Sequence, residues 1–106
     1  MIDDGWRDLM PEEFRDVITN AQGGSQHKIL GRYDLLPPKA LDLVAAVLEY
    51  GAETYGVRNW EKIPPEDHLN HALAHVFTAL RHTSKRKQKE ELSHAACRVL
   101  FALDML

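Results

Sequence analysis

Residues 37–60 have the sequence Pro-Pro-Lys-Ala-Leu-Asp-Leu-Val-Ala-Ala-Val-Leu-Glu-Tyr-Gly-Ala-Glu-Thr-Tyr-Gly-Val-Arg-Asn-Trp, and this stretch decides the fold. The proline pair suits the first turn of a helix, and Gly56 suits a left-handed stop at its end. Between them, apolar residues recur at the spacing of one helix face. The stretch therefore predicts a helix over residues 38–55, whose apolar face consists of Leu41, Val44, Ala45, Leu48, Ala52 and Tyr55.

The remaining segments predict an all-α fold, since no useful β-alternation occurs. We expect a short helix over residues 11–20, a flexible break at 22–26, a helix from about 64 to 82 or 84, a basic hinge at 85–89, and a last helix over 90–106. The apolar stripe of the helix after residue 64 is Leu69, Leu73, Val76, Phe77 and Leu80. One short and three longer helices make a thin bundle, so we expect one domain, residues 1–106, completed by a dimer or tetramer.

The composition limits the function classes. The chain has 106 residues and a formal net charge of −3, which argues against duplex nucleic acid as the main ligand. The single Cys97 excludes an internal disulfide framework. No apolar run approaches the ~20 residues that span a bilayer, so no membrane contact and a cytoplasmic location are expected.

Two groups of side chains are candidates for a metal centre. Glu49 and Glu53 are four residues apart on one predicted helix, and Glu91 and His94 are three residues apart on another. Carboxylates so placed can offer oxygens to Mg²⁺ or Mn²⁺, and Arg98 on the second face can address a phosphate. The alternative is that these residues form solvated helix rims.

His68, His71, His75 and His82 form a loose stripe on the helix after residue 64. Two histidines four residues apart can share Zn²⁺, which is one interpretation. The other is that His71 and His75 face an internal polar site and orient its metal ligands, while His68 and His82 lie at wet helix ends.

Asn59 and Trp60 follow the predicted helix end. Trp60 can stack on a purine or deoxyribose and Asn59 can pair with a base edge; the alternative is that Trp60 anchors its loop to the core. Lys28 and Arg32, near the Gly-Gly break, are candidates for phosphate binding or are solvated surface charges.

The order of these motifs resembles a known family. The motifs are Lys28…Arg32-Tyr-Asp-Leu-Leu-Pro-Pro, Tyr-Gly-Ala-x-x-Tyr-Gly-x-Arg-Asn-Trp60, Ala74-His75 and Ser93-His-Ala-Ala-Cys97. The chain is thereby similar to the phage dATP/dGTP diphosphohydrolase N-terminal domain family, which is related to MazG-like all-α nucleotide pyrophosphohydrolases. The resemblance covers about residues 27–105 and leaves 1–26 as a weakly matched extension.

The resemblance implies hydrolysis of dGTP or dATP to the monophosphate and pyrophosphate, with Mg²⁺ or Mn²⁺ bound by acidic residues from two helices. It assigns Glu49, Glu53, Glu91 and His94 to the metal, with Glu53 and Glu91 catalytic. The chain departs from its relatives at residues 83–89, where a basic segment replaces an acidic loop. A protein that binds a nucleotide or a host protein without turnover is the alternative.

Overall fold

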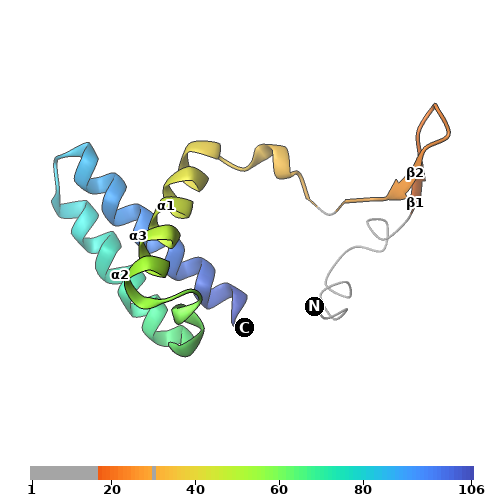
Figure 1. Ribbon diagram of the computed structural model, residues 1–106. Helices are drawn as coiled ribbons and strands as arrows, with labels where there is room; N and C mark the ends of the chain where they lie inside the picture. The colour runs from red at the N-terminus through yellow and green to blue at the C-terminus, as the bar shows by residue number, and fades with distance from the viewer. Residues whose placement is uncertain (1–16, 30) are drawn as a thin grey trace. The chain divides into compact units, whose positions relative to one another are not determined.

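The computed structural model describes residues 17–29 and 31–106. The chain divides into two units, Met1–Leu36 and Pro37–Leu106, and each is described by itself (Figure 1). The predicted short helix lies partly outside the described residues, since its residues 11–16 are not among them.

The first unit contains a small antiparallel hairpin, formed by β1 (Val17–Thr19) and β2 (Ser25–His27). Its turn is closed by the Asn20 side chain, which accepts hydrogen bonds from the backbone N–H of Gln22 at 3.0 Å and of Gly24 at 2.9 Å. The prediction of a helix through residues 17–19 is therefore wrong, whereas the predicted break at 22–26 contains part of the hairpin turn and the first residues of β2. An asparagine that bonds its own turn stabilises a hairpin even when the strands are too short to show alternation.

In the second unit, helix α1 covers Pro38–Tyr55, as predicted. Pro38 occupies the first helical turn, where a missing N–H has no cost. Gly56 ends the helix with φ 96° and ψ 152°, while its N–H donates to the carbonyl of Ala52 at 3.0 Å. A short 3₁₀ turn, η4 (Asn59–Lys62), follows.

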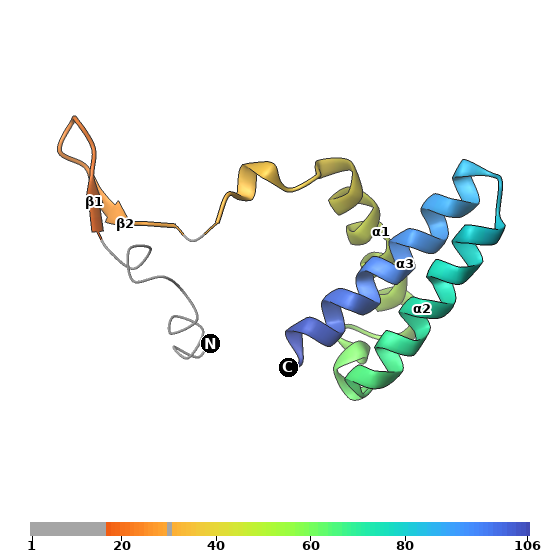
Figure 2. The same cartoon turned by 180° about the vertical axis from the view of Figure 1, so that it is seen from behind.

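Helices α2 (Pro65–Arg81) and α3 (Lys85–Asp104) complete the unit. They form a helical hairpin, and α1 packs against α3 (Figures 1 and 2). The prediction of a basic hinge at residues 85–89 is wrong, because these residues begin α3. Lysine, arginine and glutamine favour helix, and the Ser84 hydroxyl accepts from the Lys87 N–H at 3.4 Å as the cap.

The core of this unit is built from small side chains. Helix α2 faces α3 with His68, Ala72 and Ala79, and the other buried residues are Val44, Ser93, Ala95, Cys97 and Ala102. The Cys97 thiol donates to the carbonyl of Val44 at 3.6 Å, and burial raises its pKa.

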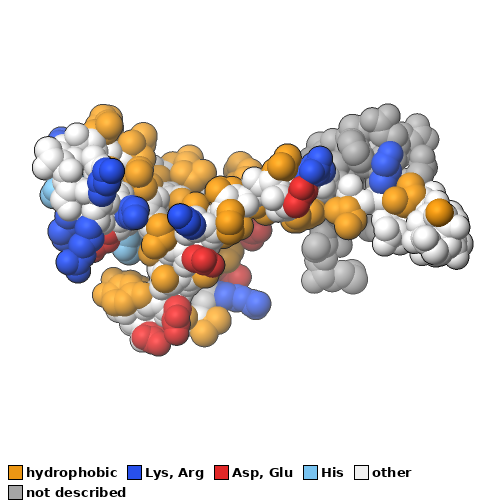
Figure 3. All heavy atoms as spheres, turned by 90° about the horizontal axis from the view of Figure 1, so that it is seen from above, with side chains coloured by type: hydrophobic (Ala, Val, Ile, Leu, Met, Phe, Trp, Pro, Cys, Tyr) orange, Lys and Arg blue, Asp and Glu red, His pale blue; other side chains and the backbone are white. Residues whose placement is uncertain are grey.

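The predicted apolar stripes are largely exposed in the chain. Phe77 and Leu80 are 57% and 75% exposed, and exposed hydrophobic side chains are visible over the helical unit in Figure 3. The reason is geometric: His68, Ala72 and Ala79 share the face of α2 that packs on α3, and Leu69, Leu73 and Leu80 each follow one of them by one residue, about 100° around the helix. The large apolar residues of α2 therefore lie outside the core of the helical unit.

Among residues 17–29 and 31–106, no helix is both long and apolar enough to cross a membrane.

Candidate functional site

A cavity of about 490 Å³ lies where the end of α1, the segment after it, and α3 meet. Its walls include Tyr55, Trp60 and Phe101, together with the positively charged Arg58 and Arg98. No aspartate or glutamate is among the described residues that line it. Arginines without opposing carboxylates, beside aromatic rings, are suited to an anionic ligand that carries a flat group.

The segment that forms one wall owes its path to two backbone conformations. Gly56 leaves the helix with positive φ, and Arg58 adopts the left-handed region at φ 59°. Arg58 is the one described non-glycine residue with positive φ. The two turns bring Asn59 and Trp60 from the end of α1 to the cavity.

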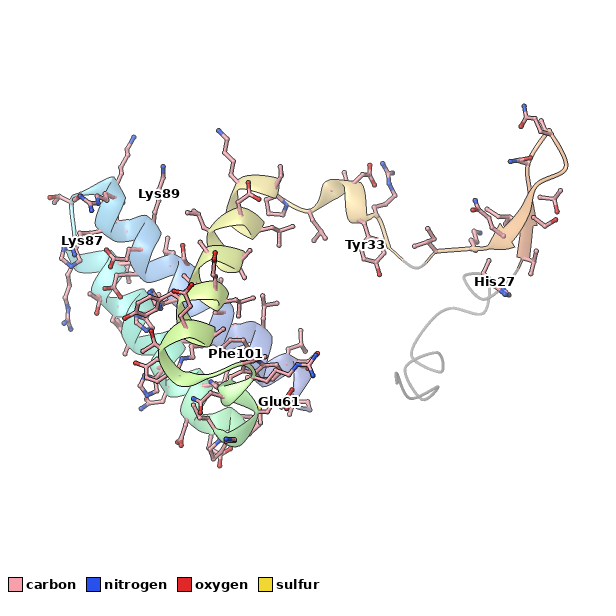
Figure 4. The ribbon with its side chains drawn as sticks, viewed as in Figure 1. His27, Tyr33, Glu61, Lys87, Lys89 and Phe101 are labelled. Carbon is pink, nitrogen blue, oxygen red and sulfur yellow. The ribbon has the colours of Figure 1, made fainter. Side chains whose placement is uncertain are left out.

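Trp60 is fixed by stacking. Its ring lies parallel to that of Phe101, with centroids 4.7 Å apart and an interplanar angle of 3°. Figure 4 labels Phe101 on α3 and Glu61 in η4, at the same end of the helical unit. One face of the indole is therefore covered by Phe101, and Trp60 anchors its loop to α3, as the alternative interpretation expected. The predicted contact with a base or sugar must use the rest of the ring.

His68 connects this wall to Arg98. Arg98 can only donate, so its Nη1 donates to His68 Nδ1 at 3.1 Å, and Nδ1 carries no proton. His68 Nε2 then carries the proton and donates to the carbonyl of Trp60 at 2.9 Å. His68 is 0% exposed, and the edge of its ring contacts Phe101 with centroids 5.2 Å apart.

This chain of bonds fixes both the position of Trp60 and the direction of the Arg98 guanidinium. The expectation that His68 lies at a wet helix end is wrong, because its face of α2 packs on α3. His71, expected to face inward, is exposed, since it lies about 100° around α2 from the buried Ala72. Arg98, predicted as a phosphate ligand, does line the cavity.

A second polar cluster joins α2 and α3 on the same side of the unit. His75 Nδ1 donates to Glu91 Oε2 at 2.7 Å, and the rings of His75 and His94 stack with centroids 5.2 Å apart. The hydrogen bond from His75 lowers the pKa of Glu91. His75 and His94 line the cavity, whereas Glu91 contacts it only through His75. Glu91 and His94, the predicted metal ligands of α3, therefore both lie beside His75, which was predicted to orient such ligands.

Glu49 and Glu53, the other two predicted metal ligands, lie elsewhere on the helical unit. Both are exposed, and neither lines the cavity. Glu53 is nine residues after the buried Val44, which places it about 180° around α1. Within the described residues, no group of three or more His, Cys, Asp or Glu is placed to hold a metal ion.

Lys28 and Arg32 belong to the first unit. Arg32 forms a bidentate pair with Asp34, with bonds of 2.8 and 2.6 Å, and this contact lowers the pKa of Asp34. Lys28 is exposed and directly follows β2. The proposed contact of these two residues with phosphate stays a prediction.

Sequence reasoning missed His68 and Phe101. A signal for the histidine was present: His68, Ala72, His75, Ala79 and His82 follow one another at intervals of four, three, four and three residues, the pattern of one helix face. These are small or polar side chains, whereas the predicted apolar stripe was drawn through the larger residues beside them. No local signal marks Phe101, because its partner is 41 positions away in the sequence.

The model of one protein family, described as dATP/dGTP diphosphohydrolase, N-terminal, matches residues 20–106. No curated protein and no solved structure matches the chain. The match includes the whole helical unit, the cavity and the hairpin strand β2. The chain belongs to the dATP/dGTP diphosphohydrolase N-terminal domain family.

Proposed function

We propose that this chain hydrolyses dGTP or dATP to the deoxynucleoside monophosphate and pyrophosphate. Membership of the family supports this reaction. The family model describes an N-terminal domain, so the activity of this chain by itself is what we propose. The observation that carries it is the cavity beside Trp60 and Phe101, with Arg98 fixed in its wall by His68.

The chain's own residues divide the work of binding. Arg98 binds a phosphate through the guanidinium N–H groups that His68 does not use. Asn59 and the uncovered part of Trp60 contact the base or the sugar, since both line the cavity. Water attacks the α-phosphorus and loses a proton to the solvent, the bond from that phosphorus to the bridging oxygen breaks, and pyrophosphate leaves with the electron pair.

Dependence on Mg²⁺ or Mn²⁺ is part of the proposal. One copy of the chain does not supply a protein-only metal cage in its described residues. Mg²⁺ is commonly held by one or two carboxylates together with substrate phosphates, and Glu91 and His94 are the available groups near the cavity. The lowered pKa of Glu91 keeps it ionised, which suits a metal ligand better than a proton acceptor.

A second copy of the chain is the proposed way to bring in Glu49 and Glu53. The support is the exposed apolar face of α2, since a face of several large hydrophobic residues marks an interface. This face consists of Leu69, Leu73, Val76, Phe77 and Leu80. Phe77→Glu should convert the oligomer to a monomer in light scattering.

The test of the function is pyrophosphate release from each deoxynucleoside triphosphate with Mn²⁺. Turnover of a purine deoxynucleotide that is lost in Glu91→Gln would support the proposal. Glu53→Gln examines the second carboxylate: full activity would remove it from the reaction. Binding of dGTP without turnover would instead favour the non-catalytic nucleotide-binding protein.

A further inference from the structure

A second cavity, of about 590 Å³, lies between the middle of α1 and the first half of α3. Helix α1 contributes Leu43, Ala46 and Tyr50 to its walls, and α3 contributes Arg86, Lys89 and Ser93. It includes part of the basic segment 85–89, to which the proposed function gives no role.

The two cavities adjoin. Val47, Tyr50 and His94 line both of them, so together they form one groove along the boundary of α1 and α3. Tyr50 and His94 stand at the junction from opposite helices. The groove therefore leads from Trp60 and Phe101, past His94, to Arg86 and Lys89.

The far end of the groove is cationic. Arg86 and Lys89 are exposed, and neither has an ion-pair partner in the part of the chain that the structure describes. Glu90 also lines this end, but it forms an ion pair with Lys87 at 3.5 Å. Figure 3 shows Lys and Arg side chains gathered at the end of the helical unit where α3 begins.

The dimensions fit an extended nucleotide. Lys89 and Phe101 are twelve residues apart on one helix, about 18 Å at a rise of 1.5 Å per residue. Figure 4 shows the two residues near opposite ends of α3. An extended deoxynucleoside triphosphate has a similar length from its base to its terminal phosphate.

We propose that the groove binds the triphosphate in one direction, with the base at Trp60 and Phe101 and the terminal phosphates at Lys89 and Arg86. This inference rests on the proposed function and deepens it. The α-phosphate then lies near Arg98 and His94, and Lys89 and Arg86 hold the end that leaves as pyrophosphate. The basic segment thus becomes a binding site for polyphosphate.

The experiment compares ligands that differ only in that end. The double variant Arg86→Ala and Lys89→Ala should lower the affinity for dGTP about tenfold, since each exposed ion pair contributes modestly. Its affinity for dGMP, which has no terminal phosphates, should stay within about twofold. The matched control is Arg81→Ala with Lys85→Ala, which removes the same two residue types, exposed and outside the groove, and should leave both affinities unchanged.

Inorganic tripolyphosphate separates the two proposals. If dGTP binds and the two double variants weaken it equally, or if dGMP is weakened as much as dGTP, the proposed direction is wrong while the proposed function stands. If no nucleotide binds but tripolyphosphate does, and Arg86→Ala with Lys89→Ala abolishes its binding, the polyphosphate site stands and the nucleotide function falls. Binding of none of the three ligands would refute both.

Discussion

Replacing His68 by glutamine and by asparagine separates the two hydrogen bonds of its imidazole. Asparagine carries its polar atoms at the δ position, where His68 accepts from Arg98, and glutamine carries them at the ε position, where His68 donates to Trp60. His68→Asn should therefore keep the contact with Arg98, and His68→Gln should keep the contact with the loop. Both variants retain a polar group in a fully buried position.

The expected magnitudes differ for the two variants. The Trp60 carbonyl also accepts from the Ile63 N–H at 3.2 Å, so loss of the His68 bond leaves it partly satisfied. His68→Asn should then cost about 1–2 kcal/mol of unfolding free energy from that bond and from the altered packing. In His68→Gln, Arg98 regains rotamer freedom, which is worth up to about 2 kcal/mol for an arginine and should weaken triphosphate binding roughly tenfold.

The assays are a urea titration of each variant and a binding titration with dGTP. We expect His68→Asn to lose more stability than affinity for dGTP, and His68→Gln to lose affinity for dGTP out of proportion to its stability. Arg98→Lys, which keeps the charge but not the planar guanidinium, serves as the control for an unanchored cation. Equal dGTP affinities in the two His68 variants would refute the inferred tautomer and the positioning of Arg98.

Three further predictions concern stability and reactivity. The hydrogen bond from His75 lowers the pKa of Glu91, so the stabilisation of the fold by this bond is complete above the usual glutamate value of 4.5 and disappears as the pH falls through the lower native pKa. In urea titrations, His75→Ala should therefore flatten the loss of stability in that acidic range. Gly56→Ala should destabilise the folded chain by about 1–3 kcal/mol, because φ 96° with ψ 152° belongs almost exclusively to glycine. Gly51→Ala, inside α1 with open space at Cβ, should stabilise it by about 0.5–1 kcal/mol, and thermal unfolding of the two variants checks both. Cys97 should react with a thiol reagent only as fast as the protein opens, because its thiol is buried and its pKa is raised; rapid labelling of the folded chain would contradict its position.

The helices were predictable where punctuation residues bound them. Pro38 and Gly56 fixed the ends of α1, and the proline pair before Glu66 fixed the start of α2. The start of α3 was missed because a run of positive charge resembles a solvated turn, although its residues favour helix and Ser84 caps it. The hairpin was missed because strands of three residues have too little alternation to detect.

The core and the candidate site were harder to predict for a different reason. Sequence patterns rank large hydrophobic residues first, but the packed face of α2 carries His68, Ala72 and Ala79. Arg98 was predictable as a candidate ligand from its type and position on α3. Its hydrogen bond to a residue 30 positions earlier depends on tertiary packing, which no local pattern encodes.

The small residues between the helices also determine how the chain can vary in sequence. In most domains, truncation of a large core residue is the damaging change. Here Ala72, Ala79, Ala95 and Ala102 fill the interior, so enlargement is the damaging change: each added methylene must separate two helices or force a side chain from its rotamer. A saturation mutagenesis of α2 and α3 should therefore show its strictest positions at alanine, with size limits there narrower than at the neighbouring leucines.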